Sequence, residues 1–226
     1  MRDDDAARAL YPFLYPSSES AADLAGVLRE ASASILRKCR DIVALRGALL
    51  EEYADELVTA GHALAAAFSA GGKLLAFGNG GSATDAQDAA TDCTLPALPG
   101  WRPLPALALV EDGAVLTAIA NDIGVDAIFT RQLIAFGRAG DIALGISTSG
   151  HSANVAAALL EARQRGMLTV AFAGNDGGSL AHSGAIDHCF VARSEHIPRI
   201  QEGHATLWHA LLDIVQARLA AQEAAA

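Results

Sequence analysis

The chain has 226 residues, of which 52% are hydrophobic and only 5% aromatic, and its formal net charge is −10. That acidic balance argues against nucleic-acid binding, which needs a basic face. No apolar run reaches the roughly 18 residues of a membrane span, and the acidic amino end lacks a secretory signal, so we expect a cytoplasmic protein with no membrane partner. Cys39, Cys93 and Cys189 are too scattered to indicate a disulfide framework or a cysteine metal site.

The predicted elements begin with an irregular arm over residues 1–20, followed by a helical hairpin with helices over 21–45 and 48–70. Strands are then predicted over 73–77, 105–110, 141–146, 167–172 and 186–191. Helices are predicted between and after them, over 84–94, 113–120, 126–137, 153–165, 178–182 and 198–221. This alternation predicts an α/β fold, a three-layer αβα sandwich with a parallel sheet, forming a single domain over residues 21–226. Its ligands should bind at the carboxyl ends of the strands.

The first strand runs directly into a glycine-rich turn that contains Asn79, Gly80, Gly81 and Ser82. Glycines allow a tight turn and close approach to a ligand, and the following helix start offers unpaired N–H groups, so the turn is a candidate anion site. The alternative is an ordinary turn from strand to helix. The glycine spacing fits neither a Walker A loop nor a dinucleotide fingerprint, and we expect no nucleotide cofactor.

A second loop of the same kind follows the strand at 141–146. It carries four hydroxyls within six residues, from Ser147, Thr148, Ser149 and Ser152, immediately before a helix. Such a loop donates many hydrogen bonds without a fixed positive charge, which suits a phosphate monoester. The alternative is simple capping of the helix, although capping requires only one such residue.

The helix after the glycine-rich turn carries three acids. Asp85, near the helix start, is explained by the helix dipole. Asp88 and Asp92 are neighbours on one helix face beyond the first turn, where like charges repel. They could be solvated surface acids, or they could serve as a general base, a metal ligand or both.

Three stretches together carry a family resemblance: Gly78–Ser82, Ile146–Ser152, and Arg199-Ile200-Gln201-Glu202 with His204. Their order and spacing resemble the sugar isomerase (SIS) domain, and within it the phosphoheptose isomerases. The resemblance implies a flavodoxin-like sheet and the isomerisation of sedoheptulose 7-phosphate to a heptose 7-phosphate. It also implies a sugar phosphate substrate and a homo-oligomer, in this family a tetramer.

The resemblance also implies roles for individual residues. Asp92 and His209 would be the catalytic acid/base pair, and the two loops would hold the phosphate. Asp122 and Gln201 would contact the sugar. Some family members bind one zinc ion per subunit at the positions of Asp88, Asp92, Gln201 and His209, although Gln201 and His209 stand eight residues apart, about 12 Å along a helix.

The chain departs from the family pattern at two of these positions. Family members typically carry histidine at the position of Asp88 and glutamate at that of Asp92, so the carboxylate at 92 reaches roughly 1.5 Å less far. The alternative to an enzyme is a non-catalytic SIS protein, either a phosphosugar sensor or a partner of a replication initiator like DiaA. Such proteins lack the acid/base pair, and the retention of an acid at 92 and of His209 favours the enzyme.

Overall fold

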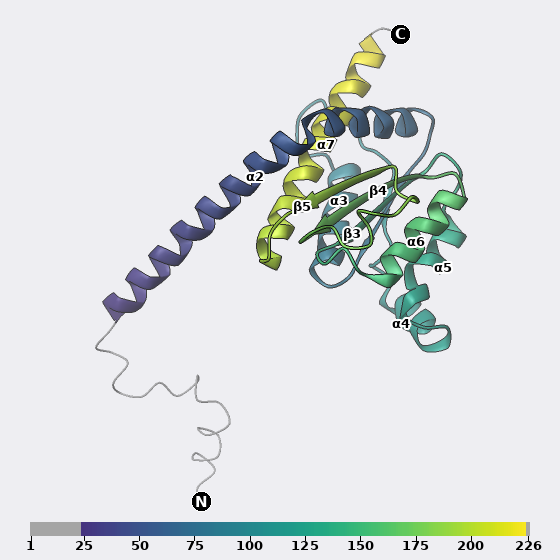
Figure 1. The fold of residues 1–226 in the computed structure, drawn as a ribbon. Helices are drawn as coiled ribbons and strands as arrows, with labels where there is room; N and C mark the ends of the chain where they lie inside the picture. Colours follow the sequence, from purple (N-terminus) through teal and green to yellow (C-terminus); the bar gives the residue numbers. More distant parts are fainter. Residues whose placement is uncertain (1–23, 225–226) are drawn as a thin grey trace, which may run out of the picture. The chain divides into compact units, whose positions relative to one another are not determined.

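The computed structural model describes residues 24–224 (Figure 1), so the arm expected over residues 1–20 lies outside the described part. The described residues divide between two units, one that ends at Asp41 and one that begins at Ile42. The second unit contains the sheet, the helices that cover it and every candidate site residue named above.

The predicted hairpin of two N-terminal helices is wrong. Residues Leu24–Ser69 form one uninterrupted helix, α2. We expected a break near Gly47, but one glycine costs a helix only about 1 kcal/mol, and no proline follows it within α2. Leu45 and Leu49, on either side of Gly47, are both buried in the core, and their packing outweighs that cost.

The predicted parallel sheet is confirmed. Its five strands are β1 (Leu74–Gly78), β2 (Ala106–Ala108), β3 (Ile142–Ser147), β4 (Leu168–Gly174) and β5 (His188–Ala192). They are hydrogen-bonded in the order β2-β1-β3-β4-β5, and every neighbouring pair is parallel. The register pairs Gly78 with Ile146, so β1 and β3 end at the same level.

The helices after β1 are α3 (Gly81–Thr94), α4 (Gly113–Asp122), α5 (Ile128–Phe136), α6 (Ala153–Gln164) and α7 (Ile197–Ala224), with a 3₁₀ turn, η3, at Val125–Ala127. α3 begins three residues earlier than predicted, after Gly80 as N-cap. The short helix predicted over 178–182 is instead a set of turns. Gly177 and Gly178 have φ values of 92° and 54°, a left-handed backbone that does not start an α-helix.

Two hydrophobic cores cover the two faces of the sheet, because successive strand residues point to opposite sides. Leu74, Leu144 and Phe172 pack with α3, α7 and the α2 residues from Ile42 onward. Phe77, Leu159 and Phe129 pack on the other face with α5 and α6. The result is the three-layer sandwich expected from the sequence. None of the helices in the described residues has the length and hydrophobicity needed to cross a bilayer.

The strand order places both candidate loops at one point of the sheet. The chain leaves β1 for the edge strand β2 and then returns to β3 on the other side of β1. Ligands of such sheets bind where the strand order reverses, outside the carboxyl ends of the strands. The glycine-rich turn follows β1 and the hydroxyl-rich loop follows β3, so the fold brings these two loops together.

Candidate active site

The hydroxyl-rich loop is a hydrogen-bonded cluster at the start of α6. Ser147 is 2% exposed, and its Oγ lies 2.9 Å from Ser152 Oγ and 3.4 Å from Ser149 Oγ. Ser152 is the N-cap residue of α6, yet within the described chain its side chain makes no capping hydrogen bond. Capping therefore does not account for these hydroxyls, which are gathered at a helix N-terminus where they can donate to an anion.

An amide pair joins this loop to the glycine-rich turn. Asn79 Nδ2 donates to Asn154 Oδ1 at 2.9 Å, and Asn154 Nδ2 donates to Asn79 Oδ1 at 3.0 Å. The side chain predicted to bind substrate at position 79 thus holds the N-termini of α3 and α6 side by side. Asn154 was missed by the sequence reasoning, because only the pairing of β1 with β3 brings it to Asn79.

Gly78, at the end of β1, and Gly81, in the turn, both lie in close packing. A Cβ on Gly78 would lie 2.7 Å from Ser82 Cβ and 2.8 Å from the Ile146 carbonyl oxygen. A Cβ on Gly81 would overlap the carboxamide of Gln201, which comes from α7. The turn therefore lies directly against the helix that carries the remaining predicted residues.

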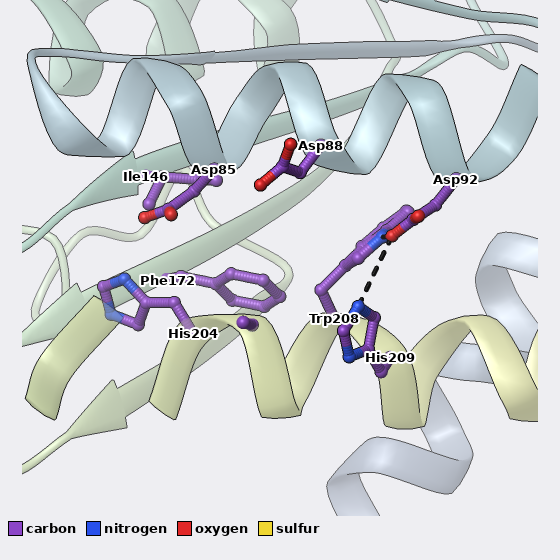
Figure 2. A pocket seen from close by; sticks show the side chains of 9 residues that line it. Asp85, Asp88, Asp92, Ile146, Phe172, His204, Trp208 and His209 are labelled. Atoms are coloured by element: carbon purple, nitrogen blue, oxygen red, sulfur yellow. Dashed lines mark hydrogen bonds and ion pairs between the residues drawn. The ribbon is translucent and has the colours of Figure 1, made fainter. Parts of the chain in front are cut away.

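Between α3 and α7 lies a cavity of about 80 Å³ (Figure 2). One wall is acidic and the other is rich in histidine and tryptophan; the polar lining residues are Asp85, Asp88, Asp92, His204, Trp208 and His209. Ile146 of β3 and Phe172 of β4 contribute apolar lining from the sheet. The cavity thus joins the strand ends to the two helices that the sequence singled out.

The structure brings the two predicted catalytic residues together. His209 Nε2 lies 3.5 Å from Asp92 Oδ2, and His209 is largely exposed, with 66% of its side chain accessible. Trp208 Nε1 donates a hydrogen bond of 3.0 Å to the same Asp92 oxygen. Asp92 is therefore fixed by the indole while it faces the imidazole, which orients the carboxylate for proton transfer.

Gln201 lies at the other end of the cavity, near the glycine-rich turn. Its carboxamide packs against Gly81 and hydrogen-bonds with Asp85. Burial raises the pKa of Asp85 to about 6, with a smaller contribution from the charge of Asp88, while the bond with Gln201 opposes the rise. Asp85 Oδ2 is buried without a partner in residues 24–224. The helix dipole does not explain an acid in this position, so the sequence interpretation of Asp85 was wrong.

His204 is a further cavity residue, which entered the sequence analysis only as part of the family resemblance. It is 1% exposed, and its Nε2 lies 2.9 Å from the carbonyl oxygen of Ala173. Its ring lies against Phe172, with centroids 5.8 Å apart. Burial lowers the pKa of His204 to about 4, so the ring is neutral at physiological pH. Only the packing of α7 on the sheet reveals this environment.

Of the four side chains suggested as zinc ligands, Asp88, Asp92 and His209 line the cavity, whereas Gln201 does not. Gln201 lies against Gly81 and Asp85, two turns of α7 away from the contact between His209 and Asp92. Nowhere in the described residues do three or more histidine, cysteine, aspartate or glutamate side chains form a group that could hold a metal ion. In this structure the four side chains are therefore not gathered into a metal site.

Asp122 stands apart from the cavity. It ends α4, where its Oδ1 accepts a hydrogen bond of 2.8 Å from Asn121 Nδ2, and it is exposed. α4 packs against η3 and α5, whereas the cavity lies between α3 and α7. Within one chain Asp122 is not brought to the other predicted site residues.

This chain is similar in sequence to the SIS domain family and to phosphoheptose isomerases. The family model for the SIS domain matches residues 39–174 of this chain. A phosphoheptose isomerase from Geobacter sulfurreducens is 46% identical over 172 residues, covering 76% of this chain and 90% of that protein. Another from Aquifex aeolicus is 42% identical over 177 residues, covering 78% of this chain and 92% of that protein.

Two solved structures of phosphoheptose isomerases are also similar to this chain. The phosphoheptose isomerase GmhA from Neisseria gonorrhoeae superimposes with a TM-score of 0.74 at 36% identity, covering 84% of this chain and 99% of that chain. A phosphoheptose isomerase from Francisella tularensis gives a TM-score of 0.72 at 31% identity, covering 84% of this chain and 98% of that chain. The similarity therefore extends over nearly the whole length of those two structures and over 84% of this chain.

Proposed function

The chain belongs to the SIS domain family, and from this premise we propose that it is a phosphoheptose isomerase, which interconverts sedoheptulose 7-phosphate and a heptose 7-phosphate. The observation that carries the proposal is the contact of 3.5 Å between His209 and Asp92 beside the cavity. A protein that only bound phosphosugars would have no use for an acid/base pair held in this way.

The substrate binds with its phosphate at the loops that follow β1 and β3. Ser82, Ser147, Thr148, Ser149 and Ser152 provide the hydroxyl groups, and the N-termini of α3 and α6 add backbone N–H groups. These donors bind a phosphate monoester without a fixed positive charge, in agreement with the acidic composition of the chain.

Asp92 and His209 carry out the proton transfers. Asp92 takes a proton from C1 of the ketose while His209 gives a proton to the C2 carbonyl oxygen, which yields an enediol. Asp92 then returns the carbon-bound proton to C2, and His209 takes the proton of the C1 hydroxyl, which becomes the aldehyde. General acid–base catalysis of this kind contributes about 10²–10⁴-fold to a rate.

The test is isomerisation of sedoheptulose 7-phosphate by the wild type, Asp92→Asn and His209→Gln. Asp92→Asn retains an oxygen that can accept from Trp208 but cannot accept a proton from carbon, so turnover should fall by at least about a hundredfold with little change in KM. Normal turnover in either variant would remove that residue from the mechanism. No turnover by a wild type that binds the sugar phosphate would refute the assigned reaction.

Metal dependence is tested in the same assay. Because Gln201 stands apart from the other three candidate ligands, we expect EDTA to leave turnover unchanged. A loss of turnover in EDTA that Zn²⁺ restores would overturn this arrangement.

We further propose that the protein works in the cytoplasm and that residues from 21 onward belong to one SIS domain. We also propose that it forms a homo-oligomer, which by analogy with the family is a tetramer. Support for self-association comes from α2, where Val43, Leu50 and Val58 are exposed apolar side chains. Light scattering after size-exclusion chromatography would measure the molar mass, and a value of one chain would refute the oligomer.

A further inference from the structure

One wall of the cavity carries a buried histidine that the proton transfers do not use. Nε2 of His204 lies 2.9 Å from the carbonyl oxygen of Ala173, which can only accept a hydrogen bond. Nε2 therefore carries the proton, and in the neutral ring Nδ1 is left as an acceptor. The lowered pKa of His204, caused mainly by burial, agrees with this neutral form.

His204 Nδ1 is buried and has no hydrogen-bond partner among the residues that the structure describes. A buried polar atom without a partner costs about 1–3 kcal/mol, so an acceptor here is expected to be satisfied by something that enters the cavity. Asp85 Oδ2, across the cavity on α3, is also buried and without a partner in the same part of the chain. Figure 2 shows the His204 ring on α7 with one nitrogen turned toward the α3 side, where the Asp85 carboxylate projects into the cavity.

The position of these two acceptors along α3 indicates which part of a ligand they meet. Asp85 follows Ser82 of the glycine-rich turn by three residues, about one helical turn, and precedes Asp92 by seven residues, about two turns. The acceptors thus lie between the phosphate-binding loops and the Asp92–His209 pair. In a sugar phosphate extended along α3, this stretch is the hydroxyl-bearing part of the carbon chain, and hydroxyls are the donors that two acceptors require.

We propose that His204 Nδ1 and Asp85 Oδ2 accept hydrogen bonds from hydroxyl groups in the middle of the sugar chain and so select the substrate by its length and stereochemistry. This inference rests on the proposed function. A site built to hydrogen-bond a substrate hydroxyl discriminates strongly against a ligand that lacks it, because the acceptor is then left unpaired.

Two matched variants of His204 separate this role from a structural one. His204→Gln places a side-chain N–H near the position of Nε2, which keeps the bond to Ala173 and removes the Nδ1 acceptor. His204→Asn places an oxygen near the position of Nδ1, which keeps the acceptor and removes the bond to Ala173. Binding of sedoheptulose 7-phosphate and of inorganic phosphate is measured by calorimetry for both variants, after circular dichroism confirms that each is folded.

The proposal predicts that His204→Gln binds sedoheptulose 7-phosphate about tenfold more weakly and inorganic phosphate as tightly as the wild type. His204→Asn should bind the sugar phosphate within about threefold of the wild type, although it should unfold at a lower temperature. Asp85→Asn, which replaces the free acceptor by a donor, should weaken sugar binding to a similar extent as His204→Gln.

Unchanged sugar binding by His204→Gln would overturn the proposal, as would a loss that is greater in His204→Asn than in His204→Gln. Because the readout is the affinity at equilibrium, it can be compared between variants whether or not the sugar is isomerised. A wild type that binds the sugar without isomerising it would refute the proposed reaction while the His204 variants still decide this inference.

Discussion

The buried neutral state of His204 predicts a specific acid sensitivity of the fold. Its pKa falls from an ordinary 6.5 to about 4, mainly because burial disfavours the charged ring, and the hydrogen bond to the Ala173 carbonyl only partly opposes this. Since the folded-state pKa lies below that of the unfolded chain, the stability contributed by neutral His204 is fully present above pH 6.5. It is lost as the pH falls toward 4.

The size of the effect follows from the two pKa values. At about 1.4 kcal/mol per pKa unit, the full loss is about 3 kcal/mol, reached below pH 4. Between pH 7 and pH 5 the unfolded state takes up most of a proton that the folded state excludes, so the free energy of unfolding should fall by about 2 kcal/mol from this group alone.

The assay is denaturant unfolding of the wild type and His204→Gln at pH 7 and pH 5, at one protein concentration. Glutamine does not titrate and retains a donor for Ala173, so the variant should lack the loss of about 2 kcal/mol. All other titrating groups are shared, and the difference between the two proteins isolates His204. Equal losses in both proteins would show that His204 is not held neutral by burial and would refute the reasoning.

Three further predictions concern residues that hold the site. Trp208→Phe removes the N–H that fixes Asp92, so kcat should fall about tenfold with little change in KM in steady-state assays; an unchanged kcat would show that the indole does not orient the carboxylate. Gly81→Ala drives a methyl group into the carboxamide of Gln201, and we expect a several-fold rise in KM for the sugar phosphate, whereas an unaltered KM would show that Gln201 moves freely. Asp85 has a raised folded-state pKa of about 6, so its stabilising contribution is present at low pH and is lost as the pH rises through 6. In denaturant titrations Asp85→Asn should therefore be more stable than the wild type at pH 8, by about 1 kcal/mol because solvent partly screens the side chain, and this advantage should disappear near pH 4.

The sequence predicted only part of the candidate site. Residues close to one another in the sequence could be recognised as a group, whereas residues far apart in the sequence could not. The hydroxyl-rich loop could be found because Ser147, Ser149 and Ser152 are close in sequence. The pairing of Asp92 with His209 was implied only by the family resemblance, since 117 positions separate them and no local pattern connects them. Asn154 was missed as a site residue because its partner, Asn79, lies on another element, and the buried environment of His204 depends on Ala173 of β4.

The sequence by itself determined the order of the strands, the parallel sheet and the position of the two loops after β1 and β3, because hydrophobic periodicity, glycines and helix-start residues act over a few neighbouring positions. It did not determine that α2 is continuous, since the packing of Leu45 and Leu49 outweighs the local cost of Gly47. Only the tertiary structure decided which polar groups are removed from water. The raised pKa of Asp85 and the neutral ring of His204 both follow from the way α7 packs along α3 and over β4, and burial of this kind is not encoded in any local pattern.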